Sequence, residues 1–127
     1  MIRVNNPAGS YRTNFSGQTS TGEADLPIAK GGDGQGFGPH ELIEAGLATC
    51  MVITARMYAN EHDWTLEDAA CQVRIEKSDA GDVAFVYSLT LPGLTTEQQR
   101  KINLLMSQCP VARTLTKAAS LRCDHGE

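Results

Sequence analysis

The sequence contains no cluster of lysines or arginines, and its formal net charge at pH 7 is −4. Proteins that bind nucleic acid or anionic membranes rely on such clusters to contact phosphate groups. The sequence also lacks a run of about 18 apolar residues, the length with which a helix crosses a bilayer. Its N-terminal stretch has no apolar core of the kind found in secretion signals. These absences predict a cytoplasmic protein without a nucleic-acid or membrane partner.

The sequence also holds neither a CxxC nor an HxxxH pair. Structural zinc sites are typically built from such pairs. The four cysteines, Cys50, Cys71, Cys109 and Cys123, lie far apart in the chain. Structural disulfides are rare in the cytosol. We therefore expect no metal site, no cofactor and no disulfide framework, and the thiols are interpreted as free side chains.

The local patterns predict one α+β domain covering residues 1–127, which is long enough to bury a core. Strands are expected at 11–15, 18–26, 71–76, 83–91 and 121–124. Helices are expected at 40–60, 97–108 and 110–117. The resulting order of elements is β-β-α-β-β-α-α-β. Cys71 and Cys123 alternate with polar residues on their strands and are expected to fill the core.

A glycine-rich stretch, KGGDGQGFGP, occupies residues 30–39 and contains five glycines. Such a composition is typical of a flexible connection or of a loop beside a ligand. A phosphate-binding loop would continue with Gly-Lys-Ser or Gly-Lys-Thr into a helix. Here His40 and Glu41 follow Pro39 instead. The stretch therefore does not predict a phosphate site.

The predicted helix at 40–60 has an unusual charge pattern. Between Glu44 and Arg56 lie eleven residues without a charge. A surface helix normally carries a charged face opposite its apolar stripe. We therefore expect this helix to be buried on all sides. In so short a chain, such burial favours a position at the centre of an oligomer.

Two of the thiols occupy positions that suit redox chemistry. Cys50 lies in the apolar run LATCMVI, where it either fills the core or serves as a reactive thiol. Cys109 precedes Pro110 at a predicted helix start, where backbone N–H groups favour a thiolate. A thiolate can attack a peroxide to give a sulfenic acid, which a second thiol converts to a disulfide. The two Cα atoms must then lie within about 7 Å.

Two stretches carry a family resemblance. GPHELIEAGLATC (38–50), followed by MVITARMYA, resembles the signature helix of the OsmC/Ohr family, the osmotically inducible and organic hydroperoxide resistance proteins. CPVARTL (109–115) resembles the second cysteine motif of that family. The resemblance covers nearly the whole chain. It implies an OsmC-like α+β fold and an intertwined homodimer, with long antiparallel sheets around two central helices.

The resemblance also implies an activity. The better-studied members of the family are thiol peroxidases that reduce organic hydroperoxides in oxidative stress defence. On that pattern Cys50 is the peroxidatic thiol and Cys109 the resolving thiol, and the two form a disulfide. An external dithiol, lipoyl groups being the family precedent, would then reduce this disulfide.

The sequence departs from the family pattern at the polar positions around the thiols. Family peroxidases typically carry a glutamate ten residues before the first cysteine, where this chain has His40, followed by Glu41. They also use an arginine to stabilise the thiolate, and Lys30 is the nearest equivalent by spacing, with Arg12 as a second candidate. We expect Lys30 or Arg12 to stabilise the Cys50 thiolate, and His40 or Glu41 to orient that cation. Lysine supplies charge but not the bidentate fork of arginine.

Two other functions fit the same fold. One is a dimeric binding protein whose cysteines line an apolar pocket without turnover, which the departures at His40 and Lys30 favour. The other is a thiol–disulfide exchange protein, whose Cys50–Cys109 bond would form without peroxide. The sequence leaves both open beside the peroxidase.

Overall fold

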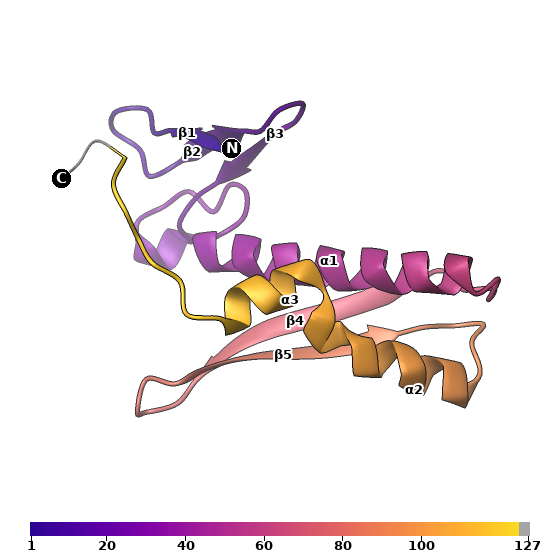
Figure 1. Cartoon of the computed structure of the whole chain (residues 1–127). Helices are drawn as coiled ribbons and strands as arrows, with labels where there is room; N and C mark the ends of the chain where they lie inside the picture. The colour runs from indigo at the N-terminus through magenta and orange to yellow at the C-terminus, as the bar shows by residue number, and fades with distance from the viewer. Residues whose placement is uncertain (125–127) are drawn as a thin grey trace. The chain divides into compact units, whose positions relative to one another are not determined.

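The structure is a computed structural model and describes residues 1–124. Its strands are β1 (Arg3–Asn5), β2 (Thr13–Ser16), β3 (Thr21–Ala24), β4 (Ala70–Lys77) and β5 (Val83–Thr90). Its α-helices are α1 (Pro39–Glu61), α2 (Thr96–Leu105) and α3 (Pro110–Thr116), with 3₁₀ turns η1 (Ile28–Lys30) and η2 (Met106–Gln108). The chain forms two compact units, Met1–Glu44 and the residues from Ala45 onward (Figure 1).

The predicted α+β class is confirmed, while the two ends of the chain differ from prediction. The strand β1 was not predicted, because it is short and exposed, has no apolar alternation and is held by its pairing with β2. The predicted strand at 121–124 is wrong, because no strand occurs after α3 in the described part of the chain. Leu121 is fully exposed there and Cys123 is exposed, so Cys123 does not fill the core. Two alternating apolar residues without a partner strand bury too little surface to fix one.

In the N-terminal unit the glycine-rich stretch is folded around the carboxylate of Asp25, which is 5% exposed. The backbone N–H of Leu26 donates to Oδ1 at 2.7 Å, and those of Asp33 and Gln35 donate to Oδ2 at 3.0 and 3.2 Å. A methyl group at Gly32 would overlap the Leu26 carbonyl and lie 2.7 Å from Oδ1 of Asp25. The loop is thus an ordered turn around a buried anion rather than a flexible connection.

The charge of Asp25 makes this loop sensitive to pH. Burial raises the pKa of Asp25, but the N–H groups of Gln35, Leu26 and Asp33, with a contribution from Arg12, outweigh burial and hold that pKa below its ordinary value. A lowered folded-state pKa means that the ionised carboxylate stabilises the fold above the unfolded pKa of about 4. That stabilisation is lost as the pH falls through the folded-state pKa.

Asp25→Asn should therefore lower the stability of the loop at neutral pH and remove the dependence of that stability on acid pH. An amide side chain can accept from fewer of the three N–H groups and carries no charge. We expect faster amide hydrogen exchange at Asp33 and Gln35 in the variant at pH 7. In the parent, protection at these amides should fall as the pH is lowered below about 4. Asp33→Asn, an exposed change in the same loop, is the matched control and should behave like the parent. Equal protection in Asp25→Asn and parent at pH 7 would contradict this role.

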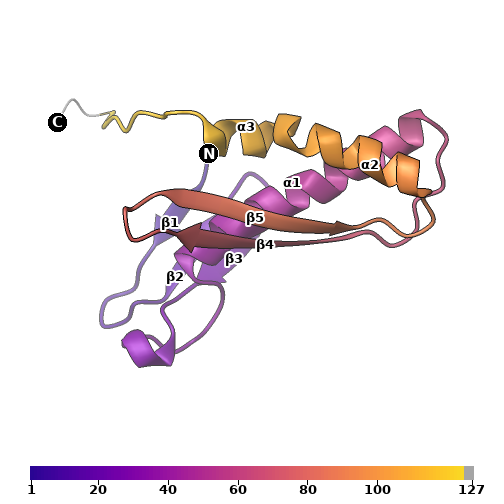
Figure 2. The same ribbon diagram turned by 90° about the horizontal axis from the view of Figure 1, so that it is seen from below.

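The C-terminal unit consists of a hairpin and three helices. β4 and β5 pair antiparallel over eight residues each, with Cys71 opposite Leu89. In both views the hairpin, α2 and α3 lie against α1 (Figures 1 and 2). The predicted capping box at the start of α2 is present, formed by Thr95 and Gln98. The three helices and the connecting segments supply the buried core, and half-buried residues of the hairpin pack against it. The buried residues are Leu47, Met51, Ala55, Ala59, Leu66, Leu91, Leu94, Ile102, Met106, Cys109 and Ala112.

The long helix α1 is buried along one stripe only. Its buried residues Leu47, Met51, Ala55 and Ala59 are spaced by four, which places them along one side of the helix. Ile53 and Met57 lie on another side and are each 58% exposed. One chain therefore does not enclose the helix, because a hairpin and two short helices cannot surround 23 helical residues. The expected burial on all sides at the centre of an oligomer stays a prediction.

By length and composition, α1 is apolar enough to cross a membrane, which the sequence analysis did not anticipate. The core helix of a soluble protein meets the same criterion. Arg56, the first charge after the apolar run, donates to the backbone carbonyl oxygens of Leu66 and Glu67. These bonds tie the helix to the loop that precedes β4, as expected of a helix packed within a protein unit.

Candidate functional site

The C-terminal unit brings Cys50 and Cys109 together. Cys50 lies on α1, half-buried, one residue before the buried Met51. Cys109 follows η2 and is 1% exposed. Cys50 packs against the buried core that contains Cys109 and lies close enough to raise the pKa of the Cys109 thiol, and both thiols are free. Residues 59 positions apart in the sequence thus meet in one core, and a disulfide between them stays a prediction.

The position of Cys109 follows from the proline after it. Pro110 is the first residue of α3, and the residue before a proline is driven out of helical geometry. Cys109 accordingly has extended backbone angles, φ −64° and ψ 147°. Its carbonyl oxygen accepts a hydrogen bond from the Arg113 N–H at 3.0 Å, which begins the helix. The break between η2 and α3 therefore fixes where the Cys109 thiol lies.

The pKa of Cys109 is shifted in the direction opposite to the one expected from its position at a helix start. Burial raises the pKa of the Cys109 thiol, and the neighbouring Cys50 adds to the rise. The N–H groups of Ala112 and Val111 lower that pKa, as predicted, but do not outweigh burial. A thiolate in an apolar interior loses its hydration, which the two N–H groups replace only in part. Cys109 therefore keeps its proton at neutral pH.

The remaining thiol beside the core, Cys71, also has a raised pKa. It is half-buried on β4 and packs against the core, as predicted. Burial raises the pKa of Cys71, with a smaller contribution from Cys109. A protonated thiol is a poor nucleophile.

The two predicted cations lie in the N-terminal unit. The guanidinium of Arg12 forms a 3.3 Å ion pair with the Glu23 carboxylate, and both side chains are partly exposed. Lys30 is exposed in the last turn of η1, next to the loop that Asp25 organises. The thiol pair lies in the other unit, so a role for either cation at Cys50 stays a prediction.

The predicted polar partners His40 and Glu41 lie in the first turn of α1. His40 is exposed. Glu41 accepts a hydrogen bond from the backbone N–H of Gly38 at 2.9 Å. This bond caps the start of the helix, which gives Glu41 a structural role independent of the thiols. A catalytic role for His40 or Glu41 stays a prediction.

An apolar cavity of about 200 Å³ lies in the same unit as the thiol pair. Its walls come from α1, β5, α2, η2 and α3, and are formed by Leu47, Met51, Phe85, Tyr87, Asn103, Met106, Ser107, Ala112, Leu115 and Thr116. None of these residues is charged. The sequence analysis did not find this cavity, because its residues come from five elements and follow the same periodicity as ordinary core residues.

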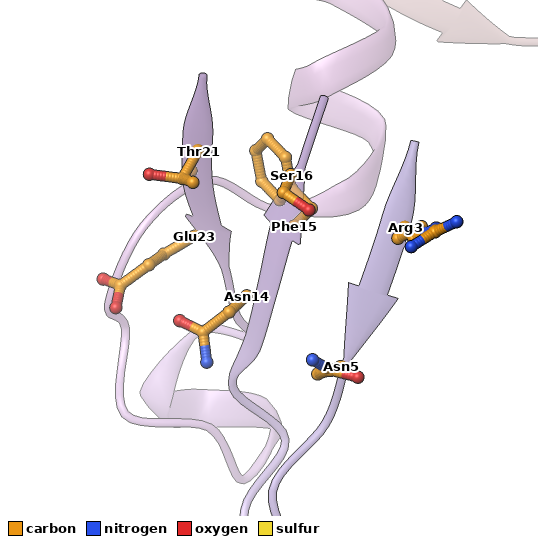
Figure 3. A pocket seen from close by; sticks show the side chains of 8 residues that line it. Arg3, Asn5, Asn14, Phe15, Ser16, Thr21 and Glu23 are labelled. Atoms are coloured by element: carbon orange, nitrogen blue, oxygen red, sulfur yellow. The ribbon is translucent and has the colours of Figure 1, made fainter. Parts of the chain in front are cut away.

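A larger hollow of about 770 Å³ covers one face of the sheet in the N-terminal unit. Polar side chains from all three strands line it, including Arg3 and Asn5 from β1, Asn14 from β2 and Glu23 from β3 (Figure 3). No thiol lines this hollow, so the redox chemistry expected from the sequence belongs to the other unit. Within residues 1–124, no group of three or more His, Cys, Asp or Glu residues could hold a metal ion.

Comparison with known proteins agrees with this arrangement. The family model of the OsmC-like protein matches residues 32–124, which include both thiols. A protein of Psychrobacter arcticus 273-4, named for osmotic stress induction and the detoxification response, is 22% identical, with a TM-score of 0.76 over 89% of this chain and 85% of its own. The OsmC-like protein of Mycoplasma pneumoniae is 21% identical, with a TM-score of 0.71 over 93% and 87%.

A third structure carries a functional name. The organic hydroperoxide resistance protein OsmC of Legionella pneumophila is 19% identical, with a TM-score of 0.66 over 91% of this chain and 88% of its own. Among curated proteins, none matches the sequence. At these identities the structures show a shared fold, and the family model covers most of the chain. The chain therefore belongs to the OsmC-like protein family.

Proposed function

We propose that the protein is a cysteine-based peroxidase that reduces organic hydroperoxides. The observation that carries this proposal is the packing of Cys50 against the core that contains Cys109, with the Cys50 thiol half-buried and the Cys109 thiol buried. Family membership adds support, since structural relatives are named organic hydroperoxide resistance proteins. The two thiols supply both electrons that the reduction of one peroxide requires.

The reaction follows from the two positions. The Cys50 thiolate attacks the terminal oxygen of the hydroperoxide, the O–O bond breaks, and the alcohol leaves after taking up a proton. Cys50 is then a sulfenic acid. The Cys109 sulfur attacks the Cys50 sulfur, its proton leaves with the hydroxyl group as water, and a disulfide forms. An external dithiol, of the lipoyl type by family resemblance, reduces this disulfide in two exchange steps.

The roles of the two cysteines follow from their exposure. Cys50 is the more accessible of the pair, so the peroxide meets it first. Cys109 is buried and keeps its proton, which protects it from direct oxidation. Because Cys50 packs against the core that contains Cys109, the two sulfurs are placed to meet in a disulfide. Lys30 or Arg12 would stabilise the Cys50 thiolate in this scheme.

Oxidation with one equivalent of cumene hydroperoxide tests the proposal. We expect two of the four thiols to disappear and one equivalent of alcohol to form. Peptide mapping should find a Cys50–Cys109 disulfide, with Cys71 and Cys123 still free. A binding protein would lose no thiols. A thiol–disulfide exchange protein would form the same disulfide with oxidised glutathione but not with the peroxide, and either result would overturn the proposal.

We also propose that the protein forms a homodimer through the exposed side of α1. Ile43, Ile53 and Met57 recur at helical spacing and are 40%, 58% and 58% exposed. Exposed apolar side chains gathered in this way typically mark an interface. A second copy of the chain would bury them and place α1 at the centre of the assembly.

Ile53→Asp should convert the dimer to a monomer. A carboxylate at the interface would lose its hydration without a partner, which costs several kcal/mol. Sedimentation analysis at micromolar concentration should show about half the parent mass for the variant. Leu104→Asp, at an exposed residue on α2, is the matched control and should remain a dimer. A parent protein that sediments as a monomer would rule out this interface.

A further inference from the structure

The last part of the chain carries a positive charge that the rest of the chain does not share. Residues 98–124 contain five lysines or arginines and one carboxylate, Asp124, although the whole chain has a formal net charge of −4. These cations are spread along the sequence, so no basic run marks them. Arg113 and Lys117 lie four positions apart at the end of α3, a spacing that makes them neighbours on a helix. The structure therefore builds a local cationic surface on an acidic protein.

A surface hollow of about 300 Å³ lies at these two cations. It is lined by four exposed residues that recur at the spacing of one helix face: Pro110, Arg113, Thr114 and Lys117. We call it the cationic hollow. The other side of α3 holds the buried Ala112 and the half-buried Leu115, which pack in the core. The core thus fixes the helix, while the cationic hollow faces solvent.

The charges of the cationic hollow are not balanced within their own unit. Among residues 45–124, the ion pairs lie on β4 and α2, and neither involves Arg113 or Lys117. The helix dipole favours one cation in the last turn of α3. A second cation four positions from the first is unfavourable, because like charges at this spacing repel. A bound anion would remove that repulsion.

The two cations suit a carboxylate. A guanidinium presents two parallel N–H groups that match the two oxygens of a carboxylate, and an ammonium adds a second positive charge. The Thr114 hydroxyl between them donates to the Pro110 carbonyl oxygen at 3.1 Å, so it also holds the turn in which the cations begin. The only apolar residue of the lining is Pro110. The cationic hollow therefore fits the charged end of a small molecule rather than a hydrocarbon group.

The cationic hollow begins next to the second cysteine of the proposed reaction. Cys109 immediately precedes Pro110, and the carbonyl oxygen of Cys109 accepts a hydrogen bond from the Arg113 N–H at 3.0 Å. Arg113 is thus about one helical turn, roughly 5.4 Å along the axis, from the start of the helix. A reductant attacks a disulfide as a thiolate, which is itself an anion. Cations at this place raise the local concentration of anionic thiols.

We propose that the cationic hollow binds the carboxylate of an anionic dithiol that reduces the Cys50–Cys109 disulfide. The inference rests on the proposed function, since that disulfide is its product. One thiolate of the reductant attacks the Cys50 sulfur, the S–S bond breaks, and Cys109 leaves and takes up a proton. The second thiol of the reductant attacks the mixed disulfide, which releases Cys50 and leaves the reductant as a cyclic disulfide. Both electrons come from the reductant.

Two reductants that differ in charge test this inference. Dihydrolipoate and dihydrolipoamide carry the same dithiol on the same carbon chain, but only dihydrolipoate has a carboxylate. We expect dihydrolipoate to reduce the peroxide-oxidised protein faster at low ionic strength. This preference should disappear in about 1 M salt, where charges are screened beyond about 3 Å.

The double variant Arg113→Gln/Lys117→Gln should slow reduction by dihydrolipoate by about fivefold, the size expected for two exposed charge pairs. Its rate with dihydrolipoamide should stay at the parent value. Arg74→Gln/Lys77→Gln removes the same charge from exposed positions on β4 and is the matched control. This control should match the parent with both reductants.

Binding can be measured without reduction. Valerate has the carboxylate-bearing chain of dihydrolipoate but no sulfur, and valeramide is its uncharged counterpart. On titration of the reduced protein with valerate, the amide NMR signals of Arg113, Thr114 and Lys117 should shift and saturate together. Valeramide should leave these signals in place.

The outcomes separate this inference from the proposed function. If valerate binds at α3 but peroxide produces no disulfide, the cationic hollow stands as a carboxylate site and the proposed peroxidase fails. If peroxide produces the disulfide and the α3 double variant loses no rate with dihydrolipoate, the peroxidase stands and the cationic hollow is overturned as the reductant site. Equal loss of rate with dihydrolipoamide would also overturn it, because the effect would then not depend on the carboxylate.

Discussion

Cys50→Ser is expected to abolish peroxide-dependent oxidation of the remaining thiols, with a fall in rate of about a hundredfold or more, as is typical when a nucleophile is removed. A serine hydroxyl is not ionised at neutral pH and cannot form a sulfenic acid. Cys109 does not take over, because burial raises its pKa and shields it from the substrate. The measurement is the rate at which reduced protein consumes cumene hydroperoxide, followed together with the number of free thiols.

Three other cysteine variants give this experiment its controls. Cys123→Ser changes an exposed thiol outside the core and should match the parent. Cys71→Ser removes a half-buried thiol. The stability of this variant is therefore measured before its rate of peroxide consumption is compared with that of the parent. Cys109→Ser should allow one rapid reaction at Cys50 and then accumulate the sulfenic acid and its further oxidation products. A Cys50→Ser protein that consumes peroxide at the parent rate would remove the basis of the proposed function.

The second large effect is expected at Gly32, where alanine should destabilise the N-terminal unit by roughly 3 kcal/mol or more, a magnitude seen when a special backbone position is strained. The added methyl group would overlap the Leu26 carbonyl and lie 2.7 Å from Oδ1 of Asp25. Neither atom belongs to a flexible side chain that can turn away, since Asp25 is held by three backbone N–H groups. Relief of the clash would break those bonds.

Chemical denaturation of the variant, followed at amide signals of the N-terminal unit, measures this effect. Gly38→Ala is the matched control, because a methyl group there would meet only the Glu41 carboxylate at an ordinary 3.4 Å. That change should leave the free energy of unfolding unchanged or raise it by up to about 1 kcal/mol, because alanine lowers the conformational entropy of the unfolded chain. If Gly32→Ala and Gly38→Ala have the same denaturation midpoint, the loop is not held by the three hydrogen bonds to the Asp25 carboxylate.

The helices and the hairpin could be predicted from the sequence because their signals are local. The capping box of Thr95 and Gln98 and the proline after Cys109 each fix a helix start through neighbouring atoms. The alternation around Cys71 fixes which face of β4 is buried. β1 was missed because its residues carry no such pattern, and its pairing with β2 alone makes it a strand.

The sequence by itself determined that the chain carries two cysteine motifs typical of the OsmC-like family and an apolar helix that holds the first. The tertiary structure decided what local signals do not encode. It brought Cys50 and Cys109 into one core. It also reversed the expected pKa shift of Cys109, because desolvation depends on what packs around a thiol and not on its neighbours in sequence. It also made the glycine stretch an ordered turn, through a carboxylate at Asp25 whose hydrogen bonds reach up to ten residues along the chain.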